Sequence, residues 1–340
     1  MIYGINYMGS KSSIAEDIVN FLPSGNRFVD LFGGGFAISH CVLINHIYNK
    51  QLSLFGQKWK SLLYNDYDPL IVDVVTKAIN GFYNYGNFKP KFINKKEFNK
   101  LKEKNGYIKT CWSFGGNGQD YLYSKEIAPY KKACHQAIVF DEWQLMKKLC
   151  PEVWQEAYKT INGIKDIKLR RLNFAPAIVK KLKQIGNWDV VIKNPLYKSC
   201  HWRGKKLNST NNDLQCLQSL ERLQRLQSLE SLERLQSLQS LERLQSLEIT
   251  CKSYEDFKYK DGDVVYCDIP YEGTHEYSGG FDHNKFYAWA YSRPYQVFFS
   301  SYDNITDTRF KCIRKKEKLS TFSSPNNSLI KIECIYTNRS

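Results

Sequence analysis

The sequence predicts an α/β fold that carries an inserted, mainly helical domain. Three observations support this class: strand-like and helix-like segments alternate near both ends of the chain, a Lys-rich and aromatic block separates them, and a leucine-triplet tract follows that block. Alternating strands and helices are typical of a sheet covered by helices in three layers. With 340 residues, 42% of them hydrophobic, the chain can bury a large core.

The first elements follow a βαβα order. Residues 26–32 and 61–66 are short apolar runs that predict strands. Residues 36–48 and 69–79 have apolar residues at helical spacing and predict the helices that follow these strands. This order is the start of a sheet whose strands are joined by crossover helices.

Strand signals return near the C-terminal end. We expect strands at 246–254, 263–268, 295–302 and 328–337, with a helix at 284–291. These segments complete the sheet that the first elements begin.

The block between the two halves, residues 81–203, differs in composition from both. It is rich in lysine and aromatic residues, and its segments 142–149 and 177–185 predict helices. We therefore expect an inserted domain at 81–203, with the remaining parts of the sheet domain at 1–80 and 249–340.

A low-complexity tract occupies residues 204–248. From Leu214 to Leu247 a leucine recurs at every third position, twelve in all. On an α-helix this spacing makes the leucines drift by about 60° per step, which excludes a heptad coiled coil and predicts a leucine stripe that winds around the helix. A solenoid rung is the alternative conformation. The tract is either an arm for docking or self-association or, the interpretation we favour, an insertion tolerated at a surface loop.

Charge and cysteine usage restrict the function classes. The formal net charge of +15 and pI near 9.2 favour a polyanionic partner such as nucleic acid, although an ordinary basic protein is the alternative. Ten cysteines without a C-x-x-C pair and six scattered histidines predict reduced thiols and no metal site. The N-terminus has no signal-peptide pattern and no apolar run is long enough to cross a membrane, so we expect a cytoplasmic protein.

Two chain segments have the composition of a ligand site. Gly33, Gly34 and Gly35 separate the first strand from its helix, where glycines allow a tight turn and a close approach of a ligand. Asp66 follows the second strand, where an acid commonly accepts hydrogen bonds from a ribose. The alternative for the glycines is an ordinary turn that links a strand to a helix. The alternative for Asp66 is a solvated acid or a helix cap.

The strand at 263–268 ends in the sequence DIPY, residues 268–271. Ligands of open α/β sheets bind beyond the carboxyl ends of the strands, so Asp268 should face a cleft. Its carboxylate can accept a hydrogen bond from an amino group, the backbone carbonyls beside Pro270 can accept another, and Tyr271 offers a ring for a planar base. This combination suits a base with an exocyclic amine.

The motifs occur in the order NYMGSK (6–11), DLFGGG (30–35), NDYD (65–68) and DIPY (268–271). This order resembles the DNA adenine methylases of the Dam type, the D12 class of N6-adenine-specific methyltransferases. The resemblance implies a Rossmann-like sheet that binds S-adenosyl-L-methionine, a catalytic domain at 1–80 and 249–340, and a target-recognition domain at 81–203. It also implies methyl transfer to adenine N6 in double-stranded DNA after base flipping.

The resemblance also implies roles for individual residues. The implied catalytic residues are Asp268, Pro270 and Tyr271. The implied cofactor-binding residues are Tyr7, Lys11, Asp30, Phe32, Gly34, Asp66 and Asp268. The implied partner is duplex DNA. For the recognition sequence the family suggests GATC only as a guess, and whether a restriction enzyme accompanies the protein is left open.

Two residues depart from the family pattern. Ile269 stands where the family motif has its first proline, and Phe36 stands where a second glycine is common. Ile269 keeps the backbone carbonyl but lacks the ring that fixes φ. A catalytically silent DNA-binding protein is therefore the alternative function, and RNA adenines or protein glutamine amides are alternative acceptors that the motif order argues against.

Overall fold

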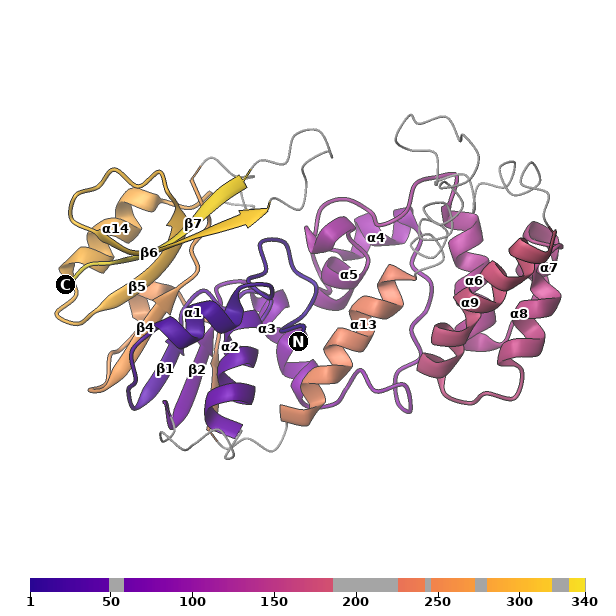
Figure 1. Cartoon of the computed structure of the whole chain (residues 1–340), viewed down its shortest axis with the longest axis horizontal. Helices are drawn as coiled ribbons and strands as arrows, with labels where there is room; N and C mark the ends of the chain where they lie inside the picture. Colours follow the sequence, from indigo (N-terminus) through magenta and orange to yellow (C-terminus); the bar gives the residue numbers. More distant parts are fainter. Residues whose placement is uncertain (49–57, 186–225, 242–245, 273–279, 320–329, 340) are drawn as a thin grey trace. The chain divides into compact units, whose positions relative to one another are not determined.

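The structure is a computed structural model of the whole chain (Figure 1), and it describes residues 1–48, 58–185, 226–241, 246–272, 280–319 and 330–339. Internal contacts divide the chain into two compact units. The first unit comprises Met1–Ile5, Gly9–Thr76 and Ser240–Ser340. The second unit comprises Asn6–Met8 and Lys77–Gln239.

A seven-stranded sheet forms the centre of the first unit, with the strand order β3-β2-β1-β4-β5-β7-β6 in the part of the chain that the structure describes. The strands are β1 (Arg27–Asp30), β2 (Ser61–Asn65), β3 (Leu247–Thr250), β4 (Asp263–Cys267), β5 (Val297–Tyr302), β6 (Lys311–Leu319) and β7 (Ile330–Thr337). Strands β1 to β5 run parallel to one another, and β7 is antiparallel to both β5 and β6. The predicted α/β class is confirmed.

The central strands are buried along their whole length. All residues of β1 and β4 are buried, and their pairing sets Phe28 against Val264 and Val29 against Val265. Such continuous apolar runs are typical of parallel strands with helices on both faces. The strand that follows β1 in sequence, β2, lies on one side of it, whereas β5, which follows β4, lies on the opposite side of β4. The strand order therefore reverses between β1 and β4.

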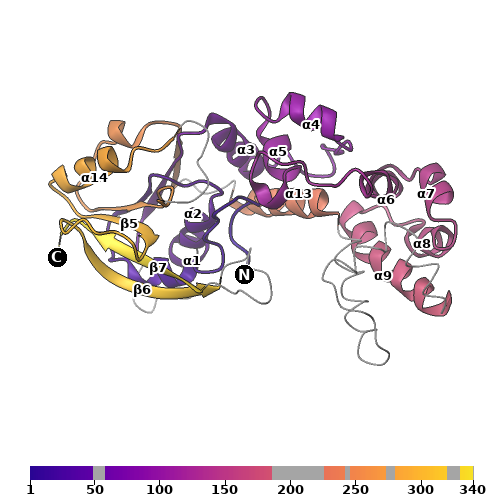
Figure 2. The ribbon, with the colours of Figure 1, turned by 90° about the horizontal axis from the view of Figure 1, so that it is seen from above.

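Four α-helices and one π-helical segment flank the sheet in the described part of the first unit. They are α1 (Ala15–Phe21), α2 (Ala37–Val42), its π-helical continuation (Leu43–Tyr48), α3 (Pro69–Ile79) and α14 (His283–Ser292). Asp282 caps α14 by accepting a hydrogen bond from the backbone N–H of Lys285. Helix α14 packs on β5 (Figure 2), where Phe286 contacts Phe299, and Phe299 in turn contacts Tyr336 of β7.

The sequence did not predict β6. This strand contains five lysine or arginine residues among nine, so it lacks the apolar run of the other strands. It lies at one edge of the sheet, where charged side chains prevent pairing with a further strand. The other predicted strands are confirmed, with boundaries shifted by a few residues.

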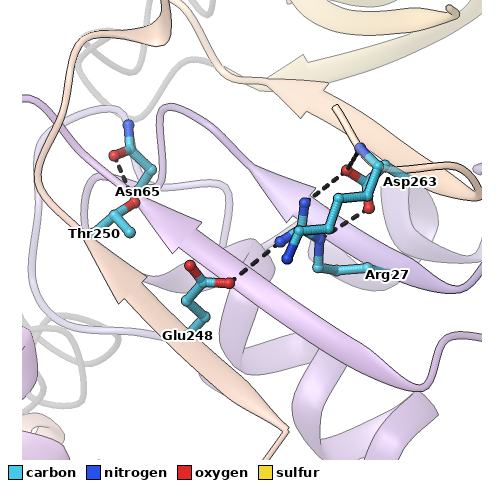
Figure 3. Close-up of polar contacts among 6 residues, drawn as sticks. Arg27, Asn65, Glu248, Thr250 and Asp263 are labelled. Carbon is cyan, nitrogen blue, oxygen red and sulfur yellow. Dashed lines mark hydrogen bonds and ion pairs between the residues drawn. The ribbon is translucent and has the colours of Figure 1, made fainter. Parts of the chain in front are cut away.

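A buried ion pair joins the amino ends of three strands (Figure 3). The Arg27 guanidinium on β1 donates two hydrogen bonds to Asp263 on β4, from Nε at 2.8 Å and Nη2 at 2.7 Å. Its Nη1 lies 3.2 Å from the carboxylate of Glu248 on β3. This fork geometry fixes the lateral position of β1 against β4.

Asn65 joins strands at their carboxyl ends, as Arg27 does at their amino ends (Figure 3). Its amide nitrogen donates to the carbonyl oxygens of Leu31 and Lys252, both at 3.0 Å. Its amide oxygen accepts from the Thr250 hydroxyl at 2.8 Å. One buried amide therefore ties the ends of β1, β2 and β3 together, next to the predicted ligand site.

The second unit is helical in its described residues. Its α-helices are α4 (Lys95–Leu101), α5 (Gly106–Cys111), α6 (Ala128–Phe140), α7 (Gln144–Leu149), α8 (Trp154–Ile161), α9 (Ile167–Ile185) and α13 (Gln227–Ser237). Aromatic rings fill its core, where Phe92, Trp112, Tyr123 and His135 contact one another. The two helices predicted at 142–149 and 177–185 are confirmed as parts of α7 and α9.

Part of the leucine tract forms α13, which lies beside α5 (Figure 1), and the residues 204–225 lie outside the described part of the chain. Six of the described leucines are buried, whereas Leu247 at the start of β3 is half-buried; the buried ones are Leu226, Leu229, Leu232, Leu235, Leu238 and Leu241. The interpretation as a surface-loop insertion is therefore wrong for this part. Only three leucines of the repeat lie within α13, so the stripe drifts by about 120° and does not wind around the helix, and residues 238–241 form a 3-10 helix whose three-residue turn matches the repeat.

Polar residues of the triplets hold α13 in the second unit. Arg171 on α9 donates to both carboxylate oxygens of Glu233, at 2.6 and 2.7 Å, and lies 3.3 Å from the carboxylate of Glu230. The Gln236 amide donates to the carbonyl oxygen of Tyr83 at 2.8 Å. The Glu and Gln positions between the leucines thus supply specific contacts, in addition to helix propensity.

We expect Arg27→Ala to lower the free energy of unfolding by about 3 kcal/mol, because it leaves the buried Asp263 carboxylate without its partner. The measurement is urea unfolding followed by circular dichroism. The control is Arg309→Ala, which removes an exposed arginine paired with Asp307 and should leave the unfolding midpoint nearly unchanged. Equal effects of both substitutions would contradict the structural role of Arg27.

The burial of α13 predicts that Leu232→Ala destabilises the second unit by about 3 kcal/mol, since it opens a cavity in the core. Leu169→Ala is the matched control, because Leu169 is exposed on α9 of the same unit. Thermal unfolding of the two variants should show a lower midpoint for Leu232→Ala alone. Similar midpoints for both variants would mean that α13 does not pack as described.

Candidate active site

Three acidic residues lie at the same edge of the sheet. Asp30 ends β1, Asp66 follows β2, and Asp268 follows β4. Because β2, β1 and β4 are adjacent and parallel, their carboxyl ends meet at one edge. The predicted site residues of the first unit therefore come together where the strand order reverses.

The centre of this edge is a buried ammonium group. Lys11 is 5% exposed, and its Nζ lies 2.8 Å from Oδ1 of Asp268 and 3.0 Å from Oε1 of Glu333. The same Nζ lies 4.4 Å from the centre of the Tyr271 ring. We call Lys11, Asp268, Tyr271 and Glu333 the lysine cluster.

The protonation state of Lys11 follows from two opposing effects. Burial lowers the pKa of its ammonium group, but the adjacent carboxylates of Asp268 and Glu333 outweigh burial and hold the pKa above its usual value. Lys11 is therefore a permanent cation at neutral pH. It binds the N-terminal motif NYMGSK to the DIPY motif by charge.

The ring of Tyr271 is oriented by three contacts. Its hydroxyl donates a hydrogen bond to Glu333, its ring meets that of Tyr302 edge to face at 4.6 Å, and the Lys11 ammonium lies over its ring. Burial, together with the negative charges of Asp268 and Glu333, raises the pKa of Tyr271 well above its usual value. Tyr271 is thus a neutral ring in a fixed orientation.

The two residues between Asp268 and Tyr271 have different environments. Ile269 is 2% exposed and packs in the hydrophobic core with Val265 and Phe286. The carbonyl oxygen of Pro270 accepts a hydrogen bond from Nε2 of His283 at 2.7 Å, which requires the proton of a neutral His283 ring to be on Nε2. The side chain of Ile269 is therefore part of the core, and the carbonyl group of Pro270 is held by His283.

Asp30 combines complete burial with a vacant acceptor. Its side chain is 1% exposed, and its Oδ2 accepts a hydrogen bond from the Ser39 hydroxyl at 2.7 Å. Its Oδ1 is buried and has no hydrogen-bond partner among the described residues. Burial, reinforced by the charges of Asp268 and Asp66, raises the pKa of Asp30 to about 7.

The glycine turn fits closely against β2. A Cβ at Gly33 would lie 2.2 Å from the ring of Tyr64, so only glycine fits there. The backbone N–H of Gly34 donates to Oδ2 of Asp66 at 2.8 Å, and its carbonyl oxygen accepts from the Tyr64 hydroxyl at 2.8 Å. Burial raises the pKa of Asp66, while these backbone hydrogen bonds oppose the shift.

Phe36, which follows the glycine turn, adopts a backbone conformation that glycine usually occupies. Its φ of 65° lies in the left-handed region, which is unfavourable for a bulky residue. The fully buried ring packs edge to face on Tyr64 at 5.0 Å and contacts His40. Core packing offsets the backbone strain, so the turn retains a glycine-like shape without a glycine.

The N-terminal segment is bound to this turn by its backbone. The N–H of Gly4 donates to Nδ1 of His40 at 3.0 Å, and the N–H of Ile5 donates to the carbonyl oxygen of Gly35 at 2.8 Å. Burial lowers the pKa of His40 to about 4, so the ring is neutral and can accept the hydrogen bond. These contacts direct the chain toward Lys11.

Phe32 and Tyr7 lie outside the lysine cluster. Phe32 is partly buried and stacks on Tyr254 at 5.4 Å, within a group of aromatic rings. Tyr7 belongs to the second unit, where the neighbouring N–H of Met8 donates to the carbonyl oxygen of Gly116 at 3.2 Å. The predicted cofactor contacts of Phe32 and Tyr7 remain predictions.

Sequence reasoning missed three residues that contact the predicted site. Glu333 binds Lys11 and Tyr271, His283 binds the Pro270 carbonyl, and Ser39 binds Asp30. A signal existed for Glu333, because an acid in the middle of the apolar strand 330–337 requires a buried partner. His283 and Ser39 had no such signal.

Comparison with known families supports the resemblance drawn from the motifs. Residues 7–125 match the family model described as D12 class N6 adenine-specific DNA methyltransferase. The match includes Lys11, Asp30, Gly34 and Asp66 and ends before the DIPY motif. A search of curated proteins gave no match.

Two further searches of the described residues concern other classes of site. Among them, no three His, Cys, Asp or Glu side chains are grouped so that they could hold a metal ion. No helix in the described ranges is long and apolar enough to span a membrane.

The raised pKa of Asp30 predicts a pH-dependent stability of the protein without cofactor. The folded state favours the protonated carboxyl, so its contribution to stability is complete below about pH 4 and is lost as the pH rises through about 7. The increase in the free energy of unfolding that Asp30→Asn causes relative to wild type should therefore be larger at pH 8 than at pH 5, by roughly 2 to 4 kcal/mol.

Urea unfolding of wild type and Asp30→Asn at both pH values measures this difference. The control is Asp261→Asn, since Asp261 is an exposed acid at the opposite end of β4. A difference between wild type and Asp30→Asn that is the same at pH 5 and pH 8 would show that Asp30 titrates normally.

Proposed function

We propose that the protein transfers a methyl group from S-adenosyl-L-methionine to the N6 amino group of adenine in double-stranded DNA. The observation that carries this proposal is the lysine cluster, in which Lys11 of the N-terminal motif binds Asp268 of the DIPY motif. The match of residues 7–125 to the N6 adenine-specific methyltransferase family supports the same activity.

The residues at the sheet edge fit a cationic cofactor. The buried Oδ1 of Asp30, which lacks a partner among the described residues, can accept a hydrogen bond from an ammonium group. Asp66 beside the backbone N–H of Gly34 provides carboxylate oxygens for ribose hydroxyls, and the ring of Phe32 provides an apolar wall. We assign these three residues, with Lys11, to the S-adenosyl-L-methionine site.

Asp268 is the proposed acceptor for the target amine. The lone pair of an adenine amino group is delocalised into the ring, and hydrogen bonds from both amino hydrogens localise it for attack. Asp268 accepts one of these bonds, and the carbonyl oxygen of Ile269 or Pro270 accepts the other. The Pro270 carbonyl already accepts from His283, which leaves it one lone pair for the amine.

Tyr271 supplies the surface for the flipped base. Because the Lys11 ammonium lies over one face of the ring, the adenine stacks on the other face. The hydrogen bond to Glu333 and the contact with Tyr302 keep the ring in place before the base arrives. Preorganisation of this kind lowers the entropy cost of aligning the amine.

The cofactor, when bound, supplies an electrophilic methyl group on a positively charged sulfur. As the bond from adenine nitrogen to carbon forms, the bond from carbon to sulfur breaks and its electron pair stays on sulfur. The nitrogen then loses one proton to solvent. Asp268, which accepts a hydrogen bond from this amine, stabilises the positive charge that develops on the nitrogen in the transition state.

The second unit is the proposed target-recognition domain. The net charge of +15 favours a polyanionic partner, and this unit contains the Lys-rich part of the chain. Its loop 113–120 is closed by hydrogen bonds, in which Asn117 accepts from the backbone of Gln119 and Asp120. A preformed loop of this kind presents its neighbouring lysines, Lys102 and Lys109, in fixed positions.

We expect Asp268→Ala to reduce methyl transfer to duplex DNA at least about a thousandfold, because it removes the acceptor for the target amine. Transfer of isotopically labelled methyl under single-turnover conditions measures the effect. Asp261→Ala is the control, as it removes an exposed acid close in sequence but at the other end of β4. Near-normal turnover of Asp268→Ala would refute the assigned role.

A further inference from the structure

Two side chains of α14 hold the chain on either side of Tyr271. Nε2 of His283 donates to the carbonyl oxygen of Pro270 at 2.7 Å, and the Tyr287 hydroxyl donates to the carboxylate of Glu272 at 3.1 Å. His283 and Tyr287 are four residues apart, so they lie on the same face of the helix. We call His283, Tyr287 and the two groups that they bind the α14 clamp.

The α14 clamp acts where the backbone has left the sheet. In the described part of the chain, the ladder of β4 ends at Cys267, before the DIPY motif begins. The ring of Pro270 fixes its φ, but its ψ, which sets the direction of the carbonyl group and of the next peptide, stays free to rotate. The hydrogen bond from His283 fixes this direction. Ring and hydrogen bond together therefore determine how the backbone enters Tyr271.

The two donors of the α14 clamp are themselves held in place. Tyr287 is 5% exposed, and its ring contacts that of Phe299 in the core. Burial, reinforced by the charge of Glu272, raises the pKa of Tyr287 above its usual value, so the hydroxyl keeps the proton that it donates. The ring of His283 meets that of Phe281 edge to face at 4.9 Å. Both hydrogen bonds therefore start from fixed side chains.

The α14 clamp complements the contacts that the Tyr271 ring makes itself. The ring contacts Lys11, Tyr302 and Glu333, which act on its face, its edge and its hydroxyl. The α14 clamp instead acts on the residues that precede and follow Tyr271 in the chain. The plane of an aromatic ring depends on its backbone as well as on its own contacts. Both sets of contacts are therefore needed to fix that plane.

We infer that His283 and Tyr287 are positioning residues, which preset the ring of Tyr271 for the target adenine by holding the backbone on both of its sides. The inference rests on the proposed function and extends it from the residues that meet the adenine to those that orient them. A stacking surface fixed in advance lowers the entropy cost of aligning the amine for attack. Loss of the α14 clamp should therefore slow methyl transfer without weakening the binding of duplex DNA.

Single-turnover methyl transfer by the full chain tests the role of Tyr287. Tyr287→Phe removes one hydroxyl and keeps the buried ring. We expect it to lower the rate constant about tenfold, the effect of one hydrogen bond to a charged group, and to keep the dissociation constant for duplex DNA within about twofold of wild type. The control is Tyr291→Phe on the same helix, because Tyr291 is 52% exposed and should keep the wild-type rate. A wild-type rate for Tyr287→Phe would overturn the inference.

Two substitutions separate the hydrogen bond of His283 from the packing of its ring. The amide nitrogen of Gln can take the place of Nε2 and donate to Pro270, whereas Leu fills space without a donor. His283→Gln should therefore retain most of the wild-type rate, and His283→Leu should lose about tenfold. Equal losses in the two variants would assign His283 to packing alone and contradict its positioning role.

Hydrogen exchange of the protein without DNA measures the α14 clamp independently of methyl transfer. Residues 268–272 should exchange at least about tenfold faster in Tyr287→Phe than in wild type, while β1 keeps its wild-type exchange. Unchanged exchange of 268–272, or faster exchange throughout the first unit, would overturn the inference and leave the proposed function intact. Wild type that transfers no methyl group to duplex DNA would overturn the proposed function and, with it, the role of the α14 clamp toward adenine.

Discussion

The buried ammonium of Lys11 connects three parts of the chain that are far apart in sequence. It binds Asp268 at the end of β4 and Glu333 on β7, and it covers one face of the Tyr271 ring. Two carboxylates and one ammonium can be buried together only if their geometry is good, since each charge loses its hydration. The need to satisfy Lys11 therefore fixes the N-terminal motif, the DIPY motif and the terminal hairpin relative to one another.

The sheet supports this cluster from both of its ends. Arg27 aligns β1 with β4 at their amino ends, and Asn65 ties β1, β2 and β3 at their carboxyl ends. Because the strand order reverses between β1 and β4, Asp30 and Asp268 end adjacent strands at the same edge. The fold thus brings acidic side chains together by topology, and Lys11 compensates part of their charge.

Regular periodicity made most of the fold predictable from the sequence. The runs 61–66 and 263–268 have the length and composition of buried parallel strands, and the acids at their ends follow from the topology. The strand β6 was missed because lysines and an arginine replace the apolar run. A helix was expected for the leucine tract, but the burial of α13 was not, because a leucine at every third position gives no lasting apolar face on a long helix. Glu333 was missed because its function depends on a contact with a residue more than three hundred positions away.

Methyl transfer by the wild-type protein tests the central claim most directly. Unmethylated duplex DNA would be incubated with the protein and S-adenosylmethionine that carries a labelled methyl group, and the digested DNA would be separated into nucleosides. The account predicts label in N6-methyladenine and in no other nucleoside. Tight binding of the duplex without labelled product, or label in a different nucleoside, would contradict the assignment of the lysine cluster to adenine methylation.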